Sequence, residues 1–252
     1  MLEVCVDSFE SVQAAVEGGA HRIELCSALS EGGLTATPGL LKAVKSHFPA
    51  TKVFAMLRSH GRISYQHTYI DMEIIEKDIV ELIENGVDGF VFGALTADRN
   101  IDVDKCRQVV DSASGLPVTF HRAFDMTIPS LKFQNVDKIA ECGFRRILSS
   151  GFAETAELGI EALTQIKKYI AEKHYNLILM PGCGVSTRNV DSILQTTGCK
   201  EFHASAKIKR TERITAHVSD TSAISKDIRN NAYAVTDRTS VQQLVTIGKK
   251  YI

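Results

Sequence analysis

Three ionisable side chains lie within the seven-residue run TFHRAFD, from Thr119 to Asp125, directly after a Gly-Leu-Pro turn. The run begins like a β-strand, and histidine is the side chain that most often transfers protons near neutral pH. Alternation lets only one of His121 and Arg122 point into a barrel, and the face shared with Thr119 favours His121. Arg122 would then lie at the rim and could pair with Asp125 or Glu24. The run therefore suits a catalytic strand end, with a metal site or a solvated loop as alternatives.

Further strand ends bring similar side chains to the same place. Glu24 lies in the strand candidate RIELCS, Arg58 lies in the segment FAMLRSHG, and His203 lies in EFHASA. In an enzyme, His121 would act as acid or base with Glu24 as its partner, while the arginines clamp a small phosphorylated or carboxylated metabolite. A satisfied interior Glu–His pair is the alternative interpretation. The predicted catalytic set is Glu24, Arg58, His121, Arg122, Asp125 and His203.

Small turns rich in backbone donors follow the last predicted strands. PGCGVSTRN places Gly182 and Gly184 before a Ser-Thr helix start, where backbone N–H groups could hold an anion. Barrels often bind phosphate with the loops after strands seven and eight. Ser150 and Gly151 in SSG, and Ser205 in SAK, would add donors to this predicted anion site. The same glycines could instead simply permit tight turns.

Two thiols have the inward parity that a soft-metal site requires. Cys5 and Cys26 would lie near the ends of the first two strands, which are neighbours in a barrel. Two thiolates on adjacent strands could bind Cu(I) as a two-coordinate ion, because soft ligands select soft ions. Neither HxH nor HExxH occurs, so a zinc or oxygen-activating site is less favoured.

Alternating strands and helices must position these residues. Four predicted helices end in glycine, at Gly19, Gly86, Gly143 and Gly198, and a strand follows each. DMEIIEKDIVELIENG has an apolar stripe of helical period, with Asp71 placed to cap it. The eight strand candidates are LEVCVD, GAHRIELCS, KVFAMLR, GVDGFVFGA, LPVTFH, GFRRILSSG, LILMPG and GCKEFHASA. Strand then helix, repeated about eight times, predicts an α/β single-domain TIM-like (β/α)8 barrel, with a doubly wound sheet as the alternative.

The repeat also predicts which side chains face the barrel interior. Aligned on their glycines, the four units superpose one set of positions and, two residues later, a second set on the same strand face. The first set is Glu24, Val91, Leu148 and His203, and the second is Cys26, Gly93, Ser150 and Ser205. Polar or very small residues near strand C-termini are unusual in a core but are expected where a substrate enters.

The chain is expected to be one domain over residues 1–252, because no linker or low-complexity stretch divides it. The exception to the regular spacing is a polar segment at about 206–238, before the last helix. A segment of that length is too long for a plain connection, so we expect an extended loop that carries a lid, a subunit contact or both.

Composition argues against several other classes of protein. An apolar content of 44% and a charged content of 23% are ordinary for a globular protein, and a formal net charge of -1 gives no basic surplus for nucleic acid or anionic membranes. No apolar run approaches the length of a membrane span, and the N-terminus does not resemble a signal peptide. The six cysteines form no CxxC pair, which predicts reduced thiols in a cytosolic protein.

Several motifs together closely resemble the CutC family of copper homeostasis proteins, in its eukaryotic form. They are EVCVDSFESVQAAVEGGAHRIELCSALSEGGLT, FVFGALTADRNID, LPVTFHRAFDM, RILSSG, LMPGCGV and EFHASA. The resemblance implies a TIM-barrel-like fold and a homo-oligomer, either a dimer or a tetramer. It also implies a cytosolic location, with the nucleus as a further one, and Cu(I) bound by Cys5 and Cys26. No nucleotide cofactor is implied.

One segment departs from the pattern of the family that the chain resembles. The family usually reads R-P-R-G-G-D-F after its third strand, whereas this chain reads RSHGRISY, which keeps only Arg58 and Gly61. The usual triple glycine after the seventh strand is here GCG, and Cys183 adds a thiol nearby. The altered segment would lie over the barrel mouth, so any activity that depends on that loop is in question.

Overall fold

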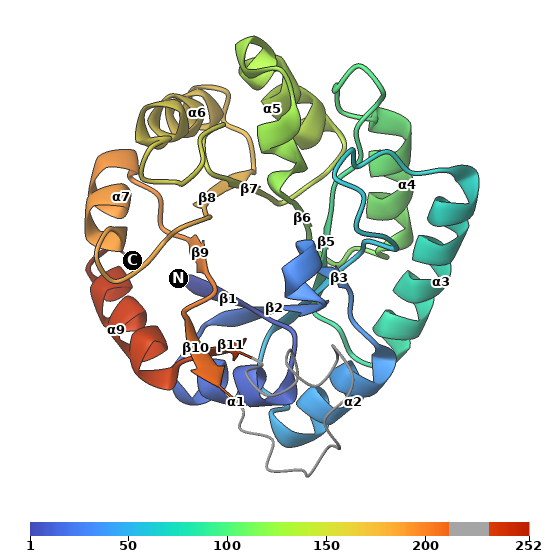
Figure 1. Ribbon diagram of the computed structural model, residues 1–252. Helices are drawn as coiled ribbons and strands as arrows, with labels where there is room; N and C mark the ends of the chain where they lie inside the picture. The colour runs from blue at the N-terminus through green and yellow to red at the C-terminus, as the bar shows by residue number, and fades with distance from the viewer. Residues whose placement is uncertain (212–231, 252) are drawn as a thin grey trace, which may run out of the picture.

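The structure, a computed structural model, describes residues 1–211 and 232–251. Eight parallel strands form a nearly closed barrel in the order β8-β7-β6-β5-β4-β2-β1-β9, with β8 and β9 adjacent in the ring of Figure 1. They are β1 (Leu2–Val6), β2 (Arg22–Ser27), β4 (Val53–Met56), β5 (Gly89–Phe92), β6 (Val118–Phe120), β7 (Arg146–Ser149), β8 (Ile178–Pro181) and β9 (Phe202–Ala204). The predicted (β/α)8 barrel is confirmed.

Helices surround the barrel (Figure 1). They are α1 (Phe9–Glu17), α2 (Pro38–His47), α3 (Tyr69–Glu84), α4 (Val103–Ser112), α5 (Lys132–Glu141), α6 (Ile160–Glu172), α7 (Val190–Thr197) and α9 (Arg238–Gly248). Short elements in the loops are η1 (Leu29–Glu31), β3 (Leu34–Thr35), η2 (Arg122–Met126), η3 (Pro129–Leu131) and η4 (Lys249–Tyr251). No helix within the described ranges is long and apolar enough to cross a membrane.

The helix ends mostly follow the sequence signals. Gly19, Gly86, Gly143 and Gly198 all have positive φ, between 66° and 90°, as helix-ending glycines should. The cap predicted for α3 is wrong by three residues, because Thr68 is the N-cap and its side chain accepts from the Asp71 N–H. The Asp71 carboxylate in turn accepts from the Thr68 N–H at 2.7 Å, which completes a capping box.

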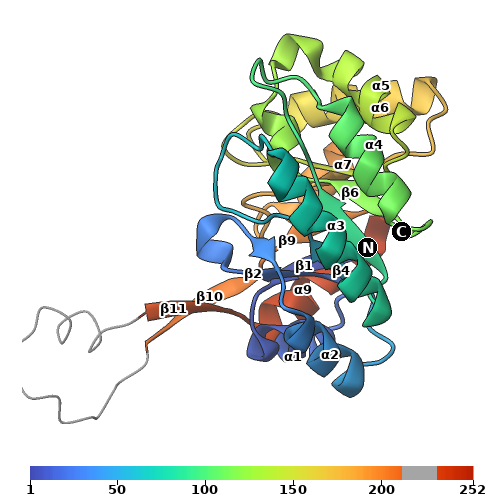
Figure 2. The same cartoon turned by 90° about the vertical axis from the view of Figure 1, so that its right-hand side faces the viewer.

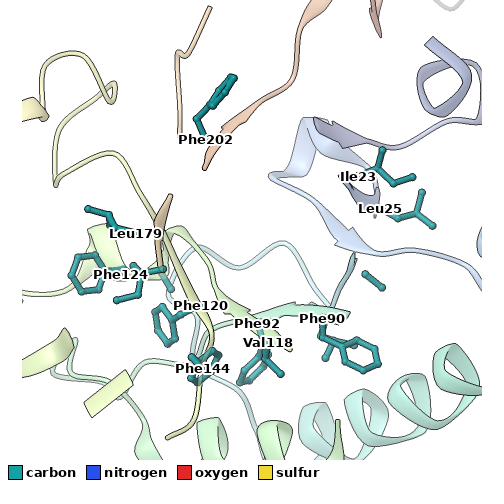
Figure 3. Close-up of a cluster of buried hydrophobic side chains, with 14 of the residues drawn as sticks. Ile23, Leu25, Phe90, Phe92, Val118, Phe120, Phe124, Phe144, Leu179 and Phe202 are labelled. Atoms are coloured by element: carbon teal, nitrogen blue, oxygen red, sulfur yellow. The ribbon is translucent and has the colours of Figure 1, made fainter. Parts of the chain in front are cut away.

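Most of the hydrophobic core lies between the strands and the surrounding helices. Large side chains that point outward from the strands, such as Phe90, Phe92 and Phe120, are fully buried there (Figure 3). Each such side chain contributes on the order of 1.5–3 kcal/mol through burial. The inside of the barrel holds a much smaller apolar cluster of Cys26, Phe54, Met56 and Val91. The polar side chains predicted to face inward therefore share the interior with little apolar packing.

A loop was predicted before α9, but both described ends of that segment form β-strands. β10 (Lys207–Thr211) and β11 (Ala232–Thr236) pair antiparallel, from Lys207 opposite Thr236 to Thr211 opposite Ala232. The resulting ribbon runs out from the barrel (Figure 2). The rest of the loop predicted at about 206–238 lies outside the described residues.

Candidate functional site

A cavity of about 220 Å³ opens at the C-terminal ends of the strands, and we call it the mouth cavity. Loops that follow parallel strands carry the reactive groups of most barrels, because they converge at this end. The lining residues are Cys5, Glu24, Leu29, Gly32, Met56, Arg58, Tyr65, His121, Arg122, Leu148 and His203. Five of the six predicted catalytic residues therefore converge on one cavity, together with one of the two predicted copper ligands.

Cys5, Glu24 and His203 form a compact cluster at the mouth. Cys5 on β1 is paired with Glu24 on β2, and one ligand atom from each of the three residues lies within 4.8 Å of the others. His203 Nε2 and Glu24 Oε2 are 3.0 Å apart. Burial by itself lowers the pKa of His203, but the neighbouring Cys5 and Glu24 raise that pKa well above its usual value. The imidazole is therefore held as a cation beside the Cys5 sulfur.

His121 is held in the opposite charge state on the other side of the cavity. Its Nδ1 accepts from the Ala123 N–H at 3.2 Å, so the neutral ring carries its proton on Nε2. Burial, followed by the charge of Arg58, lowers the pKa of His121 to about 3. Gly93 makes this position possible, because a Cβ there would lie 2.5 Å from His121 Nδ1.

Arg58 braces the rim of the mouth cavity. Its Nη1 donates to the carbonyl oxygens of Glu31 at 2.9 Å and Gly33 at 3.2 Å, and its Nη2 donates to that of Arg62 at 3.3 Å. The guanidinium also lies 5.1 Å from the centre of the Tyr65 ring. These contacts tie together the loops after β2 and β4 and engage three of the five N–H groups of Arg58.

Asp125 lies behind the cavity and pairs with Arg122, which is one of the two partners predicted for that arginine. Arg122 Nε donates to Asp125 Oδ2 at 3.0 Å. The carboxylate also accepts from Ser149 Oγ at 2.6 Å, and from the backbone N–H groups of Ser150 at 2.9 Å and Phe152 at 3.3 Å. The donors expected to hold an external anion after β7 thus hold a carboxylate of the protein itself.

The other predicted anion-binding residues do not line the mouth cavity either. The Gly151 N–H donates to Ser149 Oγ at 2.9 Å. A Cβ at Gly182 would lie 2.4 Å from Leu148 Cδ1, so this glycine makes room for a cavity-lining side chain. Gly184 and Ser205 line a separate cavity of about 240 Å³, in front of α9. The structure does not bring the five predicted anion-binding residues into one cradle.

Cys26 lies beside the mouth cavity rather than on its surface. Its side chain is fully buried against Phe54, Met56 and Val91. Burial and, next, the charge of Glu24 raise the pKa of the Cys26 thiol well above its ordinary value. Cys5 is close enough for its charge to add to that rise. The two thiols are therefore neighbours, but only Cys5 meets the cavity.

Four cavity-lining residues were not predicted from the sequence, namely Leu29, Gly32, Met56 and Tyr65. Met56 contributes a thioether, which is a soft ligand like a thiol, and Tyr65 places its ring 4.8 Å from that of His121. The alternation along β4 could have identified Met56, because it shares a face with Phe54 and Arg58. Nothing in the altered RSHGRISY segment singles out Tyr65, since its position depends on the path of the loop.

Comparisons with known proteins agree with the motifs. A family model described as "CutC family" matches residues 1–208. A copper homeostasis protein cutC homolog of Drosophila melanogaster is 45% identical over 253 residues, covering 98% of this chain and 94% of that protein. The protein of the same description from Homo sapiens is 39% identical, covering 100% and 90%.

Solved structures support the same fold. A crystal structure described as a copper homeostasis protein CutC, from Streptococcus agalactiae, superposes with a TM-score of 0.76 and 28% identity, covering 81% of this chain and 98% of that one. An aldolase called QR15 superposes with a TM-score of 0.61 at 13% identity, covering 81% and 89%. The second likeness concerns the barrel fold alone.

Proposed function

The chain belongs to the CutC family, and from this membership we propose that it serves copper homeostasis by binding Cu(I) in the mouth cavity. One observation carries the proposal: the Cys5 thiol faces the cavity, and the buried Cys26 lies on the neighbouring strand. The relatives described as copper homeostasis proteins support the metal, and the ligand chemistry supports its oxidation state. A thiolate is the side chain that best selects Cu(I) over harder ions.

Cys5 is the anchoring ligand in this proposal, and Cys26 is the second. His203, held as a cation beside the Cys5 sulfur, has no free lone pair and is not a ligand in this proposal. Cys26 follows Glu24 by two residues on the strand next to that of Cys5, so both thiols face the barrel interior. Since Cys26 is fully buried, copper would reach it from the side of Cys5, where Met56 offers a further soft atom.

A competition titration tests the proposal. Cu(I) is titrated under reducing conditions against a chromophoric chelator, with the wild type, Cys5→Ser, Cys26→Ser and Cys183→Ser. Cys183 is the matched control, because it is the more exposed thiol and its Sγ contacts the Glu154 carbonyl outside the mouth cavity. We expect the first two variants to weaken binding at least tenfold, which is about 1.4 kcal/mol, and the control to match the wild type. Unchanged affinity in Cys5→Ser would overturn the proposal.

An enzyme acting on a small anionic metabolite is the second candidate, and one observation favours it. His121 and His203 line the same cavity with pKa values displaced in opposite directions, as in sites that separate acid from base. We rank it second because much of the donor capacity of both arginines is already used: Arg58 donates to three backbone carbonyls, and Arg122 donates to Asp125 and Ser150. Thermal-shift screening against phosphorylated and carboxylated metabolites tests it. A stabilisation that persists in His121→Ala would count against it.

We also propose that the protein is cytosolic and forms a homo-oligomer. Six free cysteines, five of them buried, suit a reducing compartment. Exposed apolar side chains at Ile63, Tyr69 and Ile70 offer a surface for a second copy. Light scattering of the wild type and of Tyr69→Glu tests the assembly, and a monomeric wild type would contradict it.

A further inference from the structure

Two histidines and an aspartate meet in the loop between β4 and α3, away from the Cys5 cluster. His60, His67 and Asp71 each offer one ligand atom, and the three atoms lie within 4.8 Å of one another. His60 lies in the RSHGRISY segment, where the chain departs from the pattern of its family, and the other two residues follow directly.

His67 is buried in a way that hydrogen bonding does not explain. His67 is only 6% exposed, yet neither ring nitrogen has a hydrogen-bond partner of ordinary geometry among the described residues. The Gly93 backbone is the polar group that lies close to the ring. The ring packs 5.2 Å from that of Phe92 and 5.8 Å from that of His60. Leaving a buried polar group without a partner costs on the order of 1–3 kcal/mol, so such a group usually serves a further role.

The spacing of the three groups suits a small metal ion. His60 Nε2 lies 3.5 Å from Asp71 Oδ2. Two ligand atoms bound to one tetrahedral Zn²⁺ at about 2.0–2.1 Å are about 3.3 Å apart, so this pair needs little movement. The His67 nitrogen lies within 4.8 Å of the other two ligand atoms and has further to move.

The carboxylate is oriented by its own neighbours. Thr68 donates to Asp71 Oδ2 through both its backbone N–H and its hydroxyl, each at 2.7 Å. Ser59 Oγ lies 3.4 Å from Oδ1. Such outer contacts fix the direction of a ligating carboxylate and are typical of metal sites.

We propose that His60, His67 and Asp71 bind a divalent transition-metal ion such as Zn²⁺. Two imidazoles and one carboxylate are the borderline and hard ligands that such ions prefer, whereas Cu(I) prefers thiolates. Binding through His60 Nε2 places the ring proton on Nδ1, which breaks the 3.3 Å bond from the Arg62 N–H. That bond is long and exposed, so its loss is a small cost.

The site would also stiffen one wall of the mouth cavity. Tyr65 lies between the two histidines in sequence, and its ring contacts both His121 and Arg58. A metal that joins His60 to His67 and Asp71 fixes the ends of the segment that carries Tyr65. The metal site stands on its own residues and does not depend on copper binding at Cys5.

The test titrates untagged protein with Co²⁺ under reducing conditions, followed by absorption, with Zn²⁺ as the competitor. The variants are His60→Gln and His67→Phe, which keeps a flat ring against Phe92. His47→Gln is the matched control, because that ring is partly exposed and bonds only its own helix at the Ala43 carbonyl. Cys5→Ser separates this site from the mouth cluster.

We expect the wild type, His47→Gln and Cys5→Ser to bind one Co²⁺ with visible d–d bands and without a thiolate charge-transfer band. His60→Gln and His67→Phe should bind at least 10- to 100-fold more weakly, since even outer-contact changes at metal sites cost about that much. Should His67→Phe fail to fold, judged by circular dichroism, His60→Gln alone decides. No binding by the wild type, unchanged binding in His60→Gln, or loss of binding in Cys5→Ser would overturn the proposal.

Discussion

The interior of the barrel carries charged side chains at both ends, and their surroundings differ. At the base, Arg22 pairs with Glu3 and Glu201, and Arg146 pairs with Glu201 at 2.8 Å. Both guanidinium groups lie over the Phe54 ring, at 4.7 and 5.3 Å from its centre. Burial lowers the pKa of Arg22, but the two glutamates more than compensate and raise it. Every charged group of this base cluster thus has an opposite charge in contact.

At the mouth, opposite charges are also paired, but the two histidines of one cavity are held in different charge states. His203 is held as a cation between a carboxylate and a thiol, while His121, in the same cavity, is held neutral. Glu24 Oε1 is buried without a hydrogen-bond partner in the described part of the chain, as are Glu3 Oε1 and Arg146 Nη1 at the base. The comparison teaches that similar residue types form matched ion pairs at the base, whereas at the mouth their surroundings hold two histidines in different charge states.

Removing a charge from the base should have the largest effect on stability. Arg22→Met leaves Glu3 and Glu201 buried with less compensation, so we expect a loss of about 3–5 kcal/mol in the free energy of unfolding. Lys77→Met is the control, because its pair with Glu73 at 2.6 Å is exposed and screened by solvent, so its loss should change stability little. Urea denaturation measures both changes. Equal losses in the two variants would erase the distinction between base and surface.

His121 at the mouth should contribute to the dependence of stability on acid pH, in the same direction as His21 and His67, whose pKa values burial also lowers. His121 stays neutral in the folded protein down to pH about 3, whereas in the unfolded chain it takes up a proton below about pH 6.5. The unfolded state therefore binds more protons over that window, and stability falls as the pH falls, by up to about 1.4 kcal/mol per pH unit. His203 acts in the opposite sense, because its raised pKa gives stability that is present at low pH and lost at high pH.

Urea denaturation at several pH values between about 4 and 6.5 measures this slope, since that range lies inside the window. His121→Gln should show a shallower dependence than the wild type, because the group responsible is gone. Identical slopes would mean that His121 is not held neutral in the folded protein.

A methyl group at position 93 should disturb the mouth by a moderate amount. The Cβ of Gly93→Ala would lie 2.5 Å from His121 Nδ1 and 2.6 Å from its Cε1, so the imidazole must move. We expect a loss of about 1–3 kcal/mol, typical of overpacking. Gly39→Ala is the control, because its Cβ would meet nothing within 4 Å, and a helical Gly→Ala change there is expected to be neutral or stabilising. Thermal unfolding compares the two, and equal melting temperatures would contradict this packing argument.

The smallest stability effect is expected at the thiol itself. Cys5→Ser keeps a side chain of similar size that can hydrogen-bond beside His203, so the change should stay within about 1 kcal/mol. The affinity for copper should nevertheless fall. A lower affinity with nearly unchanged stability would show that Cys5 serves binding more than it stabilises the fold. A loss as large as that of Arg22→Met would instead make Cys5 part of the stabilising core.

Much of this arrangement follows from local sequence rules. Period-two alternation and helix-ending glycines predict the eight strands and the inward direction of Glu24, His121 and His203, because both signals depend only on neighbouring residues. The roles of these side chains in chemistry stay predictions. The pairing of Arg122 with Asp125 also follows from their spacing of three residues.

Features that depend on the path of loops could not be predicted in the same way. The Asp125 carboxylate accepts from the Ser150 N–H, 25 residues away in the sequence. The backbone donors of this turn, which suggested a site for an external anion, therefore bind a carboxylate of the protein itself. Cys26 shares the parity of a cavity residue, but the chain at Gly33 covers it, where a Cβ would lie 3.2 Å from the Cys26 sulfur. The loops therefore decide which inward-facing side chains reach the cavity, and the sequences of these loops give little indication of their paths.

The most direct test is to locate the metal. Crystals loaded with Cu(I) under reducing conditions are measured at the copper absorption edge, and an anomalous difference map shows where copper binds. The account predicts a peak in the mouth cavity next to Cys5 Sγ, on the side of Cys26. A peak confined to Cys183, to the His60–His67–Asp71 site or to the base cluster would contradict it.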